Sequence, residues 1–131
     1  ALVRAIEAAG LPCHMLPDGM TVRAREDTAF EPDSLVYCGD EVDPDSVEIA
    51  ESIIVVEVVS PSTRKIDTSR KLDGYFSVAS VHHYLIVDPV RRRIVHHQRQ
   101  SGVRILTSLY ASGSIRLDPP GLELDVERCF A

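Results

Sequence analysis

The strongest strand pattern in the chain lies at positions 53–60, Ile-Ile-Val-Val-Glu-Val-Val-Ser, which are apolar or small except for Glu57. Apolar side chains on both alternating faces are typical of a central strand that is covered on both sides. By the two-residue period of a strand, Glu57 shares a face with Val55 and Val59. An unpaired buried carboxylate is costly, so we expect Glu57 to be protonated, paired with a base or bound to a cation. The ordinary alternative is a glutamate at a strand end or facing an arginine.

The remaining hydrophobic periodicity predicts helices at both ends of the chain and around its middle, with short strands between them. Helices are predicted over 1–9, 67–79 and 125–130, and strands over 13–16, 20–24, 33–38, 84–87, 93–97, 103–110 and 115–117. The first two strands are expected to form a hairpin about Pro17-Asp18-Gly19, and residues 25–31 a polar turn. Gly74 inside a helix indicates either close packing or local weakness. The order predicts an α/β (α+β) fold with a mixed twisted sheet flanked by helices, in one domain over residues 1–131.

Composition narrows the class of protein. A hydrophobic fraction of 44% and a charged fraction of 26% are those of an ordinary globular domain. The apolar runs are too short to span a bilayer and no signal peptide opens the chain, so we expect a cytoplasmic protein. Three widely spaced cysteines indicate neither a disulfide framework nor a zinc knuckle, and we expect small core or surface residues.

The net charge of −6 argues against a protein that holds nucleic acid by a general basic surface. The negative net charge does not exclude a nuclease. The acidic residues gather between Glu26 and Glu51, while basic residues form one group at 64–71 and another at 91–93. This distribution of charge is expected if acids surround a metal and the basic segments beside them bind phosphates. A plain solvated surface would give the same distribution.

Two carboxylates are placed where they can cooperate. Asp33 opens one predicted strand and Glu57 lies in the middle of the next. If the strands are adjacent, both can bind one Mg²⁺ or Mn²⁺, with the backbone carbonyl of Val58 as a further ligand. Lys71 on the following helix is the candidate for stabilising negative charge on a phosphate. An exposed helix lysine is the ordinary alternative for Lys71.

Several segments together resemble the Uma-two (Uma2) family, which is assigned to the restriction-endonuclease-like endonucleases of the PD-(D/E)XK superfamily. The segments that carry the resemblance are Glu31-Pro32-Asp33, then Val55 to Thr63 with its Glu-Val-Val-Ser-Pro-Ser-Thr block, then Asp67, Lys71 and Tyr75, and His83 to Pro89. The resemblance covers nearly the whole chain. It implies a restriction-endonuclease-like mixed sheet and Mg²⁺-dependent hydrolysis of DNA phosphodiester bonds.

The resemblance also assigns roles to single residues. Asp33 and Glu57 correspond to the metal-binding acids, and Lys71 to the catalytic lysine, which related families supply from the adjacent helix. Val59 stands where the superfamily signature has its lysine. Ser60 and Tyr75 are expected to orient Glu57, a water or a phosphate.

Two further expectations concern the whole protein. Members of the family usually carry an additional N-terminal segment, so we expect the chain to be the C-terminal portion of a longer protein. A homodimer is a possible assembly, because restriction-like nucleases often act as dimers. The alternative function is that of a non-catalytic homologue, which would serve as a protein- or nucleic-acid-binding module.

The histidine pairs at 82–83 and 96–97 are a second constellation. A hairpin about Pro89 to Arg91 would bring His83 near His97, where two imidazoles are able to bind zinc. The sequence offers no third ligand. Histidines on a sheet surface are therefore the favoured interpretation.

Overall fold

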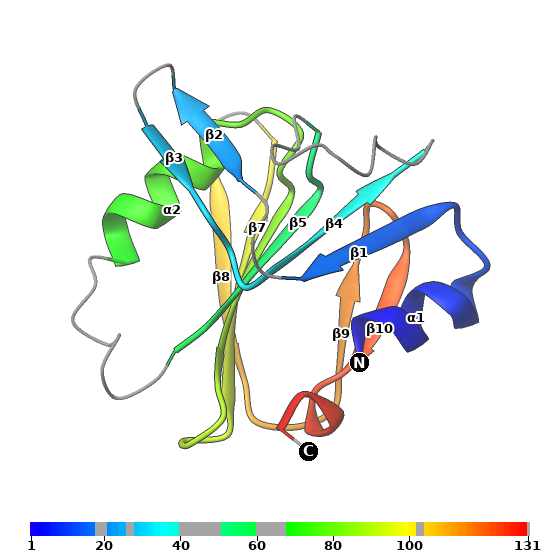
Figure 1. Ribbon diagram of the computed structural model, residues 1–131. Coiled ribbons are helices and arrows are strands. Elements are labelled where there is room, and N and C mark those ends of the chain that lie inside the picture. Colours follow the sequence, from blue (N-terminus) through cyan, green and yellow to red (C-terminus); the bar gives the residue numbers. More distant parts are fainter. Residues whose placement is uncertain (18–20, 26–27, 40–50, 60–67, 102–103, 131) are drawn as a thin grey trace.

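The computed structural model describes all residues except 18–20, 26–27, 40–50, 60–67, 102–103 and 131. Its central feature is a six-stranded mixed sheet in the order β1-β4-β5-β6-β7-β8 (Figure 1). Its strands are β1 (Cys13–Pro17), β4 (Ser34–Cys38), β5 (Ile54–Val58), β6 (His83–Asp88), β7 (Arg93–Arg99) and β8 (Ile105–Tyr110). Only β5 and β6 run parallel; the other neighbours are antiparallel. The predicted mixed sheet is thus confirmed, with the apolar strand around Glu57 in its interior.

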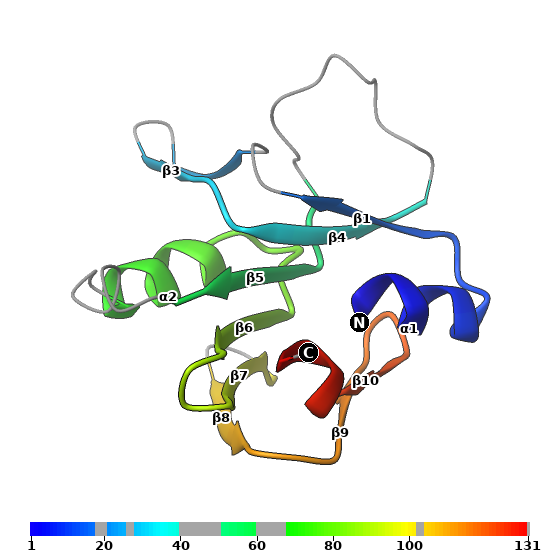
Figure 2. The same ribbon diagram turned by 60° about the horizontal axis from the view of Figure 1, so that its bottom comes forward.

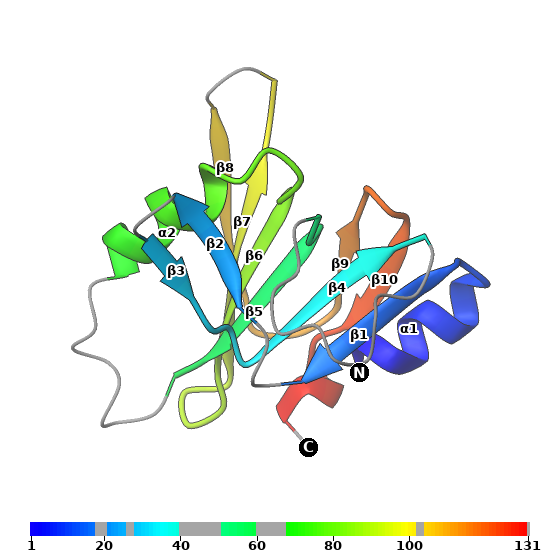
Figure 3. The same cartoon turned by 45° about the horizontal axis from the view of Figure 1, so that its top comes forward.

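Different elements cover the two faces of this sheet. On one face lie α1 (Leu2–Ala9), the hairpin of β9 (Ser114–Leu117) and β10 (Leu122–Asp125), and the 3₁₀ helix η1 (Glu127–Phe130). Figure 2 shows α1 beside β10 and β1. On the other face lie α2 (Thr68–Phe76) and the hairpin of β2 (Val22–Arg25) and β3 (Thr28–Phe30), side by side in Figure 3. The face covered by the β9–β10 hairpin is called the hairpin face below, and the face covered by α2 is called the helix face.

Alternation along the strands divides the core in two. Val36, Ile54, Val56 and Leu85 pack on the hairpin face with apolar residues of β9 and β10. The residues next to them along the strands point to the helix face and form a second cluster there. This cluster consists of Val22, Leu35, Tyr37, Val55, Tyr75, Val81 and Tyr84. Apolar residues on both sides of β5 explain why its sequence is a nearly continuous Ile/Val run.

The structure corrects the first predicted hairpin. β1 pairs with β4, in the register Cys13↔Cys38 to Pro17↔Ser34, and not with the strand that follows it. The segment after the turn pairs instead with β3, which lies inside the region predicted to be a polar turn. β10 was likewise absent from the predicted elements, and it completes the β9 hairpin. Pairing between distant segments is set by the whole sheet, which local turn chemistry cannot report.

The expectation of unpaired cysteines was wrong for two of the three. Cys13 and Cys38 face each other across β1 and β4 and form a disulfide. Cys129 is a free, partly buried thiol. The bridge links an edge strand to the strand that begins directly after Asp33.

Gly74 is explained by close packing. A Cβ atom at this position of α2 would clash with the ring of Phe30 on β3. The ring of Phe30 also packs against Tyr75, with centroids 5.2 Å apart. The glycine therefore lets the β2–β3 hairpin approach the helix that carries Lys71.

Candidate active site

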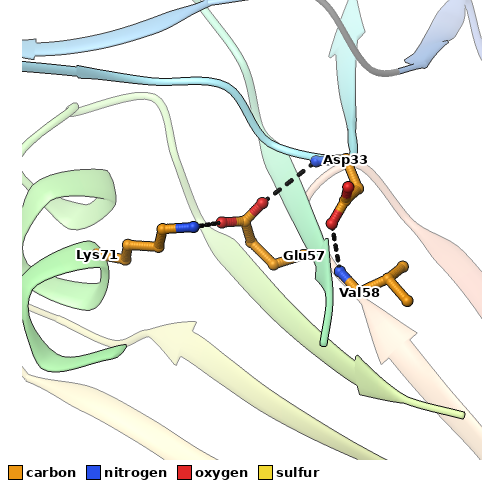
Figure 4. Close-up of polar contacts among 4 residues, drawn as sticks. All are labelled: Asp33, Glu57, Val58 and Lys71. Carbon is orange, nitrogen blue, oxygen red and sulfur yellow. Dashed lines mark hydrogen bonds and ion pairs between the residues drawn. The ribbon is translucent and has the colours of Figure 1, made fainter. Parts of the chain in front are cut away.

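The strand register brings the two predicted carboxylates together. Ser34 pairs with Val56 across β4 and β5, so Asp33, one residue earlier, stands opposite Glu57, one residue later. The backbone N–H of Asp33 donates to Oε1 of Glu57 at 3.3 Å, and the N–H of Val58 donates to Oδ2 of Asp33 at 2.6 Å (Figure 4). Each carboxylate is thus held by the backbone of the other's strand. These two backbone donors are part of the site that sequence reasoning missed.

Glu57 is buried, with 7% of its surface exposed, and by alternation along β5 it lies on the helix face with Val55. Its second oxygen, Oε2, accepts a hydrogen bond from Nζ of Lys71, which reaches in from α2 (Figure 4). Burial raises the pKa of Glu57 above its usual value; the Lys71 ammonium opposes this, and the nearby charge of Asp33 adds to it. Of the alternatives open for this carboxylate, the structure shows pairing with a base.

Tyr75 lies one helical turn after Lys71 and is fully buried. Burial raises the pKa of Tyr75 well above its usual value, and the charges of Glu57, Tyr84 and Asp33 raise it further. Its hydroxyl has no hydrogen-bond partner among the described residues. A buried hydroxyl without a partner is uncommon, and it marks a place where a water or another polar group would be stabilised.

The remaining predicted site positions have different outcomes. Ser60 lies outside the described residues. Val58 adjoins the site through its N–H, while a metal-binding role for its carbonyl stays a prediction. Val59, where the signature lysine would stand, lines a pocket with Ile86, Asp88 and Arg91.

The donor set suits a hard divalent cation. Within the described ranges, no three His, Cys, Asp or Glu side chains group together as metal ligands. Asp33 and Glu57 would contribute two carboxylates, and Mg²⁺ typically takes one or two carboxylates and keeps several waters. Two observations agree with such a site. The hydroxyl of Tyr75 has no partner among the described residues, and Glu57 already binds a positive charge, the ammonium of Lys71. Mg²⁺ or Mn²⁺ thus fits the residues present.

The histidines form a different arrangement from the predicted one. His83 is opposite Gln98 in the register, and its Nδ1 lies 2.8 Å from Nε2 of His96, not near His97. Nε2 of His83 lies 2.8 Å from the carbonyl oxygen of Pro119. His83 and His96 are 0% and 3% exposed, so their interpretation as surface histidines was wrong. They lie on the hairpin face, opposite to Glu57.

The mixed sheet flanked by helices is an α+β fold of the restriction-endonuclease-like class. A solved structure described as a putative nuclease of the DUF820 family, from Anabaena variabilis ATCC 29413, matches with a TM-score of 0.70. The match covers 97% of this chain and 72% of that one, at 11% sequence identity, and so it shows the fold.

The particular family follows from the sequence model of the Uma2 family, described as putative restriction endonucleases, which matches residues 1–128. The chain belongs to the Uma2 family. A comparison with curated proteins finds no match. Among the described residues, no helix has the length and apolar character needed to cross a membrane.

Proposed function

We propose that the protein is a Mg²⁺- or Mn²⁺-dependent endonuclease that hydrolyses DNA phosphodiester bonds. The observation that carries the proposal is the convergence of Asp33, directly before β4, and Lys71, on α2, on the buried carboxylate of Glu57 on β5. Family membership supports a nuclease in particular. Both carboxylates alone would repel a phosphate, so the chemistry requires the cation that the donor set fits.

Each residue has a separate task in this proposal. Asp33 and Glu57 would hold the cation, which when bound supplies Lewis-acid polarisation of the phosphate and an activated water. Their mutual backbone hydrogen bonds fix both carboxylates before substrate arrives. Lys71 would shift its ammonium from Glu57 to the phosphate oxygens, where negative charge develops during hydrolysis.

The apolar surroundings strengthen these interactions. Val55, Tyr75 and Tyr84 pack together on the same face as Glu57 and exclude water from its inner side. Coulomb attraction is stronger where water is excluded, so the ammonium and the cation act more strongly on a phosphate here than on an open surface.

The test is cleavage of supercoiled plasmid by the purified protein with Mg²⁺ or Mn²⁺. The wild type should nick the plasmid, chelation should stop it, and Glu57→Ala should reduce cleavage to background. Glu123→Ala is the matched control, because Glu123 is an exposed carboxylate paired with Arg116 on β9, away from this site. Equal nicking by Glu57→Ala and the control would refute the assignment. Absence of nicking by the wild type would favour the non-catalytic binding module.

A further inference from the structure

A pocket of about 570 Å³ continues the helix face of the sheet beyond the carboxylates. The register Glu57↔Ile86↔Val95↔Leu109 runs straight across β5, β6, β7 and β8. Residues in one such row point to the same face. The last three of them line the pocket, so it begins one strand from Glu57, about 5 Å away at ordinary strand spacing.

The floor of this pocket is apolar. Val59, Ile86, Val95 and Leu109 form it, and Leu109 is 67% exposed on the edge strand β8. A volume of several hundred Å³ with an apolar lining and few polar groups is typical of a small-molecule or nucleotide-sized site.

The rim of the pocket is cationic, through Arg91 and Arg93. The third lining charge, Asp88, accepts backbone N–H bonds from Val90 and Arg91, at 3.2 and 3.0 Å, and so shapes the β6–β7 turn. Arg92 takes no part in the lining. Its guanidinium lies over the ring of Phe130 of η1, 5.2 Å from the centroid, and its backbone has φ +54°. Arg91 and Arg93 thus line the pocket, while Arg92, between them, packs on η1.

We propose that this pocket holds a nucleotide of the DNA strand next to the bond that is cleaved. The base would contact the apolar floor, and the guanidinium of Arg91 would bind a flanking phosphate. The inference rests on the proposed function, because it takes the carboxylates to mark the cleaved bond.

Charge complementarity and continuity favour this occupant. In a chain of net charge −6, the pocket lining holds two arginines against one carboxylate, that of Asp88, and this local excess of positive charge attracts a polyanion. A guanidinium presents several donors in a plane and binds phosphate oxygens in pairs. The row from Glu57 to Leu109 keeps one strand of nucleic acid on a single face while it passes from the carboxylates to the arginines.

The test compares Arg91→Ala with Arg92→Ala. Both remove one positive charge from the same turn, so a general electrostatic effect cancels between them. Binding of a short fluorescein-labelled single-stranded DNA, and of its duplex, is measured by anisotropy with Ca²⁺ in place of Mg²⁺. Arg91→Ala should raise Kd about tenfold, as expected for one lost charged contact, and Arg92→Ala should change it less than about twofold.

A second variant tests the floor without disturbing the fold. Leu109→Ser changes a mostly exposed side chain and should also weaken DNA binding, by about threefold or more. In plasmid cleavage, both pocket variants should raise KM and leave kcat within about twofold, because neither residue touches the cleaved bond.

The outcomes separate the pocket from the proposed function. Equal Kd values for Arg91→Ala, Leu109→Ser and Arg92→Ala, or no DNA binding by the wild type, would overturn the pocket proposal even if the protein cleaves DNA. Binding that depends on Arg91 and Leu109 in a protein that cleaves nothing would support a nucleotide site in the pocket, but it would reject the nuclease and with it the position of that site beside a cleaved bond. A stronger effect on the single strand than on the duplex would identify an unstacked base as the bound group.

Discussion

The two faces of the sheet treat buried polar groups in opposite ways. On the hairpin face, His83 and His96 form a closed chain that ends on the carbonyl of Pro119. On the helix face, Glu57 shares a hydrogen bond with a partly exposed lysine, and the hydroxyl of Tyr75 has no described partner. The first face uses its polar groups to hold the β9–β10 connection in place. The second face, in our proposal, uses them to bind a cation and a phosphate.

Hydrogen-bond chemistry fixes the protonation of the histidine chain. A carbonyl only accepts, so Nε2 of His83 carries a hydrogen and its Nδ1 must accept. Nε2 of His96 then donates to that Nδ1. Burial lowers the pKa of both histidines to about 4, and for His83 the charge on His96 adds to the effect. The neutral pair therefore belongs to the folded state.

Glu57 has the opposite relation to stability. Because the pKa of Glu57 is raised in the folded protein, its protonated form is favoured by folding and its ionised form is disfavoured. Stability from this group is present below its unfolded pKa and is lost as pH rises through the folded pKa. At neutral pH the carboxylate is thus held at a cost to the fold, as expected for a group kept for chemistry.

Removing the charge of Glu57 should have the largest effect. Glu57→Gln keeps the size of the side chain, and we predict that DNA cleavage falls to background while the melting temperature at pH 7 rises or stays the same. Cleavage assays and thermal unfolding of the same preparation test this together. A large fall in melting temperature would mean that the carboxylate serves the fold.

Lys71→Met should separate cation binding from catalysis. Cleavage should fall by roughly 10²- to 10³-fold, because the group that stabilises phosphate charge is gone. Affinity for Mn²⁺ should rise, since Lys71 no longer competes for Oε2 of Glu57. Titration calorimetry and single-turnover cleavage measure the two effects. Weaker Mn²⁺ binding in this variant would contradict the competition.

The histidine chain predicts a pH dependence of folding on the hairpin face. Both pKa values are lowered, so stability is fully present above about 6.5 and falls as pH drops toward about 4. The loss should be on the order of 3 kcal/mol for each histidine and should be followed by urea unfolding at several pH values. Other titratable groups face the pair. His82 and Asp118 act on the pKa of His83, His97 acts on the pKa of His96, and the ring of Tyr110 packs against that of His96.

The double variant His83→Gln/His96→Gln isolates this effect from the other titrating groups. Its stability should be lower at pH 7 and should change less between pH 7 and pH 4. Glu57, with its raised pKa, acts in the opposite sense on acidification and is unchanged in the variant. An identical pH profile in the double variant would exclude the pair as the cause.

Gly74→Ala should have the smallest effect, on the helix face. Alanine favours a helix by about 1 kcal/mol, but its Cβ would meet the ring of Phe30. We predict net destabilisation of about 1 to 2 kcal/mol. Chemical unfolding measures it, and recovery in Gly74→Ala/Phe30→Leu would show that the ring contact is responsible. A more stable single variant would contradict the packing argument.

Local patterns predicted the parts of the fold that depend on neighbours in sequence. The Ile/Val run became β5, the hairpin of β6 and β7 formed as expected, and Gly10 ends α1 in a left-handed conformation. β3 was missed because Thr-Ala-Phe is too short to show alternation between its charged neighbours. β1 was paired incorrectly because its partner β4 lies beyond an intervening hairpin.

In the candidate site, too, some features could be predicted from the sequence and others depend on strand pairing. Asp33, Glu57 and Lys71 were predicted as a set from residue type, order and the family resemblance, and their roles stay a prediction. The register explains why Asp33 and Glu57 lie opposite each other, and Lys71 reaches Glu57 from α2. The disulfide and the His83–His96 contact depend on which residues face each other across strands, and an offset of one position changes the partner. The pocket requires Ile86, Val95 and Leu109 in one row, which no single segment reveals.

The central claim, that Asp33 and Glu57 form a hard-cation site, is tested most directly by the Mn²⁺ dependence of the melting temperature. The wild type should melt at a higher temperature in millimolar Mn²⁺ than in its absence, because the ion binds only the folded state. Asp33→Asn, which keeps the shape but removes the charge, should lose the shift, and Glu123→Ala should retain it. An equal shift in all three proteins, or none in the wild type, would contradict the claim.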